Sequence, residues 1–264
     1  MTAMDPPITA VLFDVGGVVV SRRAPPRPPL QPANMSRCQV RSPLLAIEAY
    51  EAAHGLPPGY INWNIYHSSP DSAWKKLERN EIPMDDDSFF HPFHADLNCP
   101  RMWAKYHKEK ASTLSPVPFI DAKWLFWEMM RTSRELDQDM LGAIRSLRET
   151  RKYRLGALTN NYIFPQEHPY RDDRQIKSLF DVYIASAEIG MRKPEHRIFE
   201  HAIKTLGVES ASQIVFLDDL GGNLRAAKQM GLRTIKVPLR GTQTAIKQLE
   251  DILGEALAPL PSKI

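Results

Sequence analysis

Residues 9–14 of this chain, TAVLFD, decide its fold class, because a short apolar run ends in an aspartate and then meets Gly16 and Gly17. A run of this length and composition is typical of a strand that is buried on both faces of a parallel sheet. After the glycines, residues 18–20 are apolar again. The sequence therefore predicts a buried parallel strand with Asp14 at its carboxyl end.

The second half of the chain alternates between strand-like and helix-like segments. Strands are predicted at residues 154–159, 182–186, 213–218 and 234–237, and helices at residues 175–179, 195–206, 224–230 and 243–253. Alternation of this kind indicates a parallel sheet covered by helices on both faces. We therefore expect an α/β fold with a doubly wound, Rossmann-like parallel sheet.

The region between the first strand and this alternating part is helical in pattern and rich in aromatic residues. Helices are predicted at residues 44–53, 73–79, 88–97, 102–110, 121–130 and 138–149. The three aspartates at 85–87 are interpreted as a turn and helix start rather than a metal site, because Asp is a favoured residue at helix N-termini. We expect a small all-helical cap inserted after the first strand.

The domain organisation follows from these patterns. Residues 1–20 and 131–264 are predicted to form the α/β core, and residues 43–130 the helical cap. Residues 21–42 are rich in Pro and Arg with almost no apolar periodicity, which is typical of a disordered insertion. Because residue 20 joined directly to residue 42 would give a smoother chain, this segment can also be interpreted as a gene-model artefact.

Composition limits the classes of partner. The chain has 264 residues, 43% of them hydrophobic, and a formal net charge of +3, which is too small to indicate a nucleic-acid partner. Cys38 and Cys99 are not in a CxxC pair, so no zinc or redox motif is visible. The apolar run at residues 8–20 contains Asp14 and is too short to span a bilayer. We expect a soluble cytoplasmic monomer or homodimer with no membrane or nucleic-acid partner.

Polar residues that can take part in catalysis or in ligand binding lie where each predicted strand ends. Asp14 ends the first strand, Thr159 and Asn160 end the second, and Asp218 and Asp219 end the fourth. The strand at 182–186 leads into a loop that carries Lys193. Because ligands of parallel sheets bind at the carboxyl ends of the strands, we expect these side chains to meet at one edge.

Each residue type has a chemical reason to be at such a site. An aspartate can attack phosphorus and form an acyl phosphate. Several carboxylates around one point repel each other unless a divalent cation neutralises them, and Mg²⁺ prefers such oxygen ligands. A lysine stabilises the charge on a phosphoryl group, and hydroxyl and amide groups can donate hydrogen bonds to it. The pattern favours phosphoryl chemistry on a small phosphorylated metabolite.

Four segments resemble the motifs of the haloacid dehalogenase-like (HAD) superfamily: FDVGGVVV at 13–20, LTNN at 158–161, GMRKPEHRIF at 190–199 and FLDDLGGNLRAAKQMG at 216–231. The subgroup that they most resemble contains the amino-terminal phosphatase domain of soluble epoxide hydrolase. The resemblance extends over residues 8 to about 250, apart from the insertion at 21–42, and it is informative for the superfamily but not for the substrate.

The resemblance implies a role for each matching position. Asp14 is implied to be the nucleophile and a metal ligand, with Lys193 stabilising charge on the phosphoryl group. The other implied roles are phosphate binding by Thr159 and Asn160, Mg²⁺ binding by the Gly16 carbonyl, Asp218 and Asp219, and orientation of the last loop by Asn223.

Gly16 departs from the pattern of this superfamily. Most of its phosphatases have a second aspartate there, whose side chain protonates the leaving group, and Gly16 can offer only its carbonyl. Loss of such an acid–base group costs about a hundred- to ten-thousand-fold in rate. Either another residue supplies the proton, or the substrate has a good leaving group, or the protein is slow or inactive.

The predicted function is therefore that of a Mg²⁺-dependent hydrolase, a phosphatase acting through an aspartyl-phosphate on Asp14. Two alternatives stay open. One is a 2-haloacid dehalogenase-type hydrolase, which also uses the first aspartate and lacks the acid at the second position. The other is a catalytically weak protein that binds phosphorylated ligands.

Overall fold

The computed structural model describes residues 6–16, 43–110, 116–133, 137–239 and 241–257. The predicted insertion at 21–42 and the apolar residues 18–20 lie outside the described residues, as does Gly17. The prediction of disorder for 21–42 therefore stays a prediction.

A five-stranded parallel sheet forms the centre of the α/β part, in the order β3-β2-β1-β4-β5. The strands are β1 (Ala10–Phe13), β2 (Arg154–Thr159), β3 (Val182–Ala185), β4 (Ile214–Asp218) and β5 (Arg233–Lys236). All four residues of β1 are fully buried because it lies between β2 and β4. The predicted α/β class with a parallel sheet is confirmed.

Alternate side chains of β1 pack on opposite faces of the sheet, as the two-residue period of a strand requires. Val11 and Phe13 contact a cluster that includes the apolar faces of α7 (Gln138–Thr150) and α12 (Gln243–Leu253). Ala10 and Leu12 contact a second cluster that includes α10 (His196–Leu206) and α11 (Gly221–Gln229). Helices therefore cover both faces of the sheet, and the predicted functional residues lie at its carboxyl edge.

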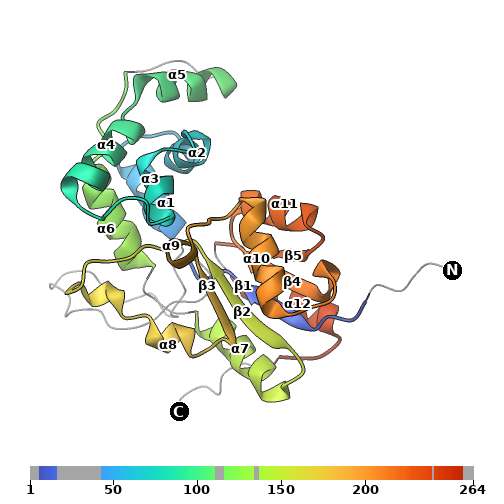
Figure 1. Ribbon diagram of the computed structural model, residues 1–264. Helices are drawn as coiled ribbons and strands as arrows, with labels where there is room; N and C mark the ends of the chain where they lie inside the picture. Colours follow the sequence, from blue (N-terminus) through green and yellow to red (C-terminus); the bar gives the residue numbers. More distant parts are fainter. Residues whose placement is uncertain (1–5, 17–42, 111–115, 134–136, 240, 258–264) are drawn as a thin grey trace, which may run out of the picture.

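The helices of the middle region form a body of their own beside the sheet in Figure 1, where they run from light blue to green. They are α1 (Pro43–Ala53), α2 (Tyr60–His67), α3 (Ala73–Glu78), α4 (His91–Leu97), α5 (Pro100–Glu109) and α6 (Ala122–Thr132), with a π-helical turn at Asp86–Phe90. We call these helices the cap. Its interior is a separate apolar cluster in which aromatic rings such as Phe89, Phe93, Phe126 and Trp74 contact one another.

The prediction missed α2. Its segment follows a Pro-Pro-Gly sequence at residues 57–59 and contains two asparagines, so its local helical signal is weak. The buried carboxylate of Glu51 compensates, because its oxygens accept hydrogen bonds from the backbone N–H groups of Gly59 (2.6 Å) and Ile61 (2.8 Å). These are unpaired donors at a helix start, which a side chain from α1 satisfies.

Two other local expectations concern helix starts. The Asp85 carboxylate accepts a hydrogen bond of 2.6 Å from Ser88 N, so the acidic run does begin a helical segment, as predicted. α11 begins at Gly221 rather than at the predicted residue 224.

Short helices α8 (Arg174–Lys177) and α9 (Ser186–Ile189) flank β3. Within the described residues, no helix has both the length and the apolar character that crossing a membrane requires.

Candidate active site

The structure brings three predicted carboxylates together at the carboxyl edge of the sheet. Oxygen atoms of Asp14, Asp218 and Asp219 lie within 4.8 Å of one another, and all three side chains are buried. Asp14 follows β1 directly, whereas Asp218 is the last residue of β4. Because β1 and β4 are hydrogen-bonded neighbours with parallel directions, their ends deliver the acids to one point.

Lys193 lies between two of these acids. Its Nζ is 2.8 Å from Oδ1 of Asp14 and 2.8 Å from Oδ2 of Asp218, and its side chain is 1% exposed. Burial alone would lower the pKa of Lys193, but the two carboxylates outweigh burial and raise it. The ammonium group stays charged, and it has three N–H donors, of which the two carboxylates take two.

Asp218 is held by hydrogen bonds on both of its oxygens. Oδ1 accepts from Leu220 N (2.7 Å) and Asn223 Nδ2 (3.1 Å), while Oδ2 accepts from Lys193 Nζ (2.8 Å) and Asn223 Nδ2 (3.0 Å). Asn223 therefore lies where it fixes the loop between β4 and α11. Because its oxygens are already occupied, Asp218 has less freedom than Asp14 to coordinate a cation directly.

Asp14 has one occupied oxygen. Oδ1 accepts a hydrogen bond of 2.7 Å from Val15 N in addition to its contact with Lys193, and no bond to Oδ2 occurs within the described residues. Burial raises the pKa of Asp14 to about 7, with Lys193 acting against the shift and Asp218 adding to it. A divalent cation beside Asp14 would favour its charged form and lower that pKa.

Thr159 is the last residue of β2 and Asn160 follows it, and their side chains make different contacts at the same edge. The buried Thr159 hydroxyl makes one weak contact, 3.3 Å to the Asn160 carbonyl oxygen. The Asn160 side chain instead contacts the backbone of Lys193: Lys193 N donates to its Oδ1 (2.8 Å), and its Nδ2 donates to the Lys193 carbonyl (3.0 Å). The Asn160 amide therefore positions the loop that carries the lysine.

Gly16 lines the same cavity as Asp14, where it offers only backbone atoms. A Cβ atom built on Gly16 would have no neighbouring atom within 4 Å, and its φ angle lies outside the left-handed region. The absence of a side chain at this position is therefore not forced by crowding in the described structure.

A cavity of about 800 Å³ lies above these residues, between the cap and the sheet. Its upper wall is mostly apolar and includes Trp63, Trp74, Met129, Tyr162 and Phe164. Trp63 and Trp74 lie in the segment that was predicted to form the cap, whereas Tyr162 and Phe164 follow β2. The sequence did not reveal their common wall, because it depends on how these segments pack.

Several charged residues of the wall were also missed, among them Arg192 and Glu78. Arg192 immediately precedes Lys193, and Glu78 ends α3, and both line the cavity. The sequence signal that could have suggested Arg192 was its position inside the motif around Lys193. For Glu78, the only signal in the sequence was its spacing of four residues from Trp74, and such a spacing is common on helices.

Comparison with known proteins identifies one family over most of the chain. Residues 8–231 match the haloacid dehalogenase-like hydrolases. Bifunctional epoxide hydrolase 2 of Mus musculus is 30% identical over 223 residues, which cover 82% of this chain and 37% of that protein. Glyceraldehyde 3-phosphate phosphatase of Methanopyrus kandleri is 28% identical over 148 residues, which cover 56% of this chain and 59% of that protein.

The chain thus spans between about a fifth and two fifths of the length of the first curated relatives that it matches. Among solved structures, a predicted HAD-like hydrolase of Porphyromonas gingivalis matches with a TM-score of 0.49 and 19% identity, over 92% of this chain and 97% of that one.

Proposed function

Because the chain belongs to the family of haloacid dehalogenase-like hydrolases, we propose that it is a magnesium-dependent phosphatase that transfers a phosphoryl group to Asp14 and then to water. The observation that carries this proposal is the buried group of three carboxylates beside Lys193. The phosphatase name of the Methanopyrus kandleri relative supports it.

The charge of the group favours a divalent cation. When ionised, Asp14, Asp218 and Asp219 carry three negative charges, and the Lys193 ammonium compensates one of them. Buried charges of one sign destabilise a folded protein unless they are paired or coordinate a metal. Mg²⁺ suits this donor set because it prefers hard oxygen ligands and leaves positions for water and phosphate. The residues present therefore fit the ion.

We assign the metal ligands from the group of three carboxylates and the backbone carbonyl beside it. Asp14 and Asp219 would hold the ion with the Gly16 carbonyl, while Asp218 is engaged by Asn223, Leu220 and Lys193. Asp218 would then act beside the ion, as the residue that fixes the lysine. Bound Mg²⁺ would supply charge neutralisation and polarise the phosphoryl oxygens.

The remaining steps follow from the chain's own groups. Asp14 Oδ2, the oxygen without a hydrogen bond in the described residues, would attack phosphorus, and the leaving oxygen would depart with the electron pair of the broken P–O bond. The third N–H of Lys193 and the Thr159 hydroxyl would bind phosphoryl oxygens, the lysine being positioned by Asn160. Water would then cleave the aspartyl-phosphate.

Gly16 limits the substrates that this site can process quickly. With no acid at that position, the leaving oxygen carries more negative charge in the transition state. The proposal therefore favours small phosphorylated metabolites with good leaving groups, such as acyl phosphates, aryl phosphates and diphosphates.

The test is phosphate release from p-nitrophenyl phosphate, measured with Mg²⁺ and with chelator. We expect Mg²⁺-dependent turnover in the wild type and none in Asp14→Asn. Asp87→Asn is the matched control, because the Asp87 side chain is 98% exposed, and it should retain full activity. A folded protein that releases no phosphate would contradict the proposal and would leave the dehalogenase-type and ligand-binding alternatives.

A further inference from the structure

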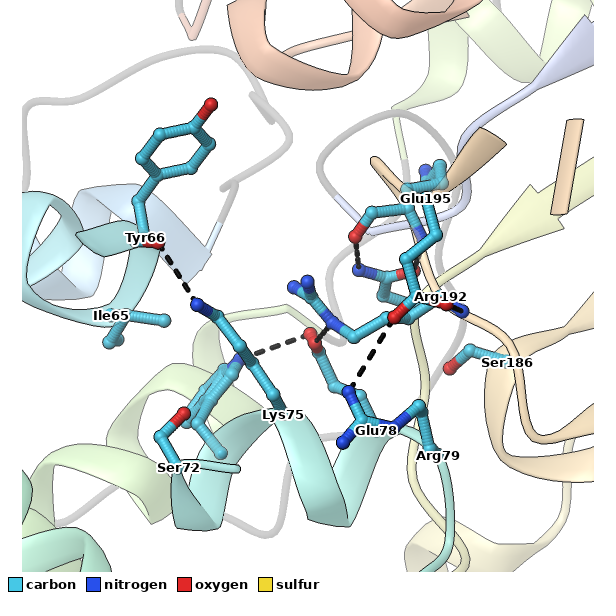
Figure 2. A network of polar contacts seen from close by, with 12 residues as sticks. Ile65, Tyr66, Ser72, Lys75, Glu78, Arg79, Ser186, Arg192 and Glu195 are labelled. Atoms are coloured by element: carbon cyan, nitrogen blue, oxygen red, sulfur yellow. Dashed lines mark hydrogen bonds and ion pairs between the residues drawn. The ribbon is translucent and has the colours of Figure 1, made fainter. Parts of the chain in front are cut away.

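Arg192 connects the loop of the active-site lysine to the cap. Its Nε donates a hydrogen bond to Oε2 of Glu78, the last residue of α3, and the two side chains are 12% and 5% exposed. Figure 2 shows the guanidinium of Arg192 directed at Glu78, between the cap helix and the loop. Lys193 points to the floor of the cavity, whereas Arg192 lies on its cap side.

Glu78 is itself fixed in place. Its second oxygen, Oε1, accepts a hydrogen bond of 3.0 Å from the indole Nε1 of Trp74, one turn earlier in α3. The nearby Lys75 is directed elsewhere, because its Nζ donates to the carbonyl oxygens of Tyr66 (3.0 Å) and Ser68 (2.6 Å). Both oxygens of Glu78 thus have a defined partner, and one of those partners is Arg192.

The rest of the Arg192 guanidinium is unused. A guanidinium has five N–H donors, and Nε supplies only one of them. The terminal nitrogens, Nη1 and Nη2, make no hydrogen bond in the described part of the chain, and they are not sealed away from solvent. A residue that served only to hold the cap would be expected to direct two nitrogens at the carboxylate. Instead, Arg192 leaves its terminal nitrogens available on the wall of the cavity.

We propose that Arg192 is a second anion-binding residue of this cavity, oriented by Glu78, and that the substrate is a small phosphorylated compound with a second anionic group, either a carboxylate or a phosphate. The proposal rests on the proposed function, because it takes the first phosphate to lie at Asp14 and Lys193. Arg192 and Lys193, two of the basic residues that line the cavity, face it from different depths, so a ligand with an anionic group at each end contacts both.

The test compares three compounds that share one chain: propyl phosphate, 3-(phosphonooxy)propanoate and propane-1,3-diyl bisphosphate. Each is measured as a competitive inhibitor of p-nitrophenyl phosphate hydrolysis, at constant ionic strength. Because hydrogen bonds to charged groups are strong, we expect at least one of the two doubly anionic compounds to bind about tenfold tighter than propyl phosphate. The ratio is the inhibition constant of propyl phosphate divided by that of a doubly anionic compound. Its value for each of the two compounds decides whether the second group is a carboxylate or a phosphate.

Arg192→Gln should reduce this ratio to about one without abolishing hydrolysis of p-nitrophenyl phosphate. Glu78→Ala should lower the ratio, whereas Glu78→Gln should keep it, because the Gln oxygen can still accept a hydrogen bond from Nε. The control is Arg79→Gln, which removes another contact between the cap and this loop, the 3.5 Å ion pair of Arg79 Nη1 with Glu195 Oε1. It should leave the ratio unchanged.

Three results would overturn the proposal: equal inhibition by all three compounds in the wild type, an unchanged ratio in Arg192→Gln, or an equal loss of the ratio in Arg79→Gln. If Arg192→Gln does not fold, the double variant Glu78→Gln/Arg192→Gln removes both charges together and replaces it. Thermal-shift titration of Asp14→Asn with the same compounds measures the ratio without turnover. Failure of the phosphatase proposal is therefore distinguishable from failure of this one.

Discussion

Asn160 and Lys193 hold each other through a reciprocal pair of hydrogen bonds, although they are 33 positions apart in the chain. The side-chain amide of Asn160 accepts from the backbone N–H of Lys193 and donates to its carbonyl oxygen, at 2.8 and 3.0 Å. The end of β2 is thereby joined to the loop after α9. The position of the lysine ammonium between Asp14 and Asp218 depends on this junction.

Asn160→Ala removes both bonds and should lower kcat for p-nitrophenyl phosphate by about a hundredfold, because small displacements of a positioned group have effects of this size. It should also lower the free energy of unfolding by about 1–3 kcal/mol. Asn98 is the matched control, because it makes the same pair of bonds with the backbone of Ile120 in the cap (2.8 and 2.9 Å). Asn98→Ala should lose similar stability but keep kcat, and equal losses of kcat in both variants would contradict the assigned role.

Magnesium should stabilise the folded protein in the absence of substrate. Binding at a hundred times Kd contributes about 2.7 kcal/mol, which is roughly 5–10 °C in Tm for a chain of this size. Asp219→Asn should lose most of this shift, whereas Asp87→Asn should keep it. Differential scanning fluorimetry with Mg²⁺ and with chelator measures the shift, and an undiminished shift in Asp219→Asn would exclude that residue as a ligand.

Gly16→Asp should fold normally, because the space around an added Cβ is open. The new carboxyl group should raise kcat/KM for alkyl phosphates by about a hundred- to ten-thousand-fold. It should have a much smaller effect on p-nitrophenyl phosphate, whose leaving group needs little protonation. Gly16→Asn has the same shape without the acid and should show no gain. A gain of equal size for both substrates would indicate a cause other than leaving-group protonation.

Glu51 should make the stability of the cap depend on pH. Burial raises its pKa, and the hydrogen bonds from Gly59 and Ile61 oppose that shift without cancelling it. A carboxyl group with a raised pKa in the folded state binds its proton more tightly there than in the unfolded chain. Its contribution to stability is therefore complete below the unfolded pKa and is lost as the pH rises through the folded pKa.

The comparison with Glu51→Gln, a neutral group of the same shape, isolates this dependence. The Tm of the wild type relative to Glu51→Gln should fall as the pH is raised from the acidic range to neutrality. A relative Tm that rises with pH would mean that the backbone donors of α2 dominate over burial. Circular dichroism melts across the pH range decide between the two signs.

The sheet and the acids at its edge could be predicted because their signals are local. A buried strand has a continuous apolar run, and the polar residue that follows it, such as Asp14 or Asp218, marks its end. Parallel topology then brings those ends together whatever the length of the connecting segments. For the same reason Lys193 could be assigned to this edge from the strand before it.

The remaining features depend on contacts between distant segments, which leave no local pattern. α2 exists because Glu51 of another helix satisfies its first N–H groups, and no periodicity within residues 60–67 reveals this. Asn160 has the residue type of a phosphate ligand, but its amide is occupied by the Lys193 backbone. The pair of Glu78 and Arg192 joins positions 114 apart.

Glu78, the last residue of α3, and Arg79, which follows it, have a consequence for unfolding. Glu78 forms an ion pair with Arg192, and Arg79 forms one with Glu195. Two adjacent positions of the cap therefore contact one loop of the core. Phe164, which follows β2, packs in the aromatic cluster of the cap, and the two clusters around the sheet are separate from that cluster. If the cap melted alone, both ion pairs and the packing of Phe164 against the cap would be lost. Cap and core should therefore denature in a single cooperative transition, although each has an apolar interior of its own.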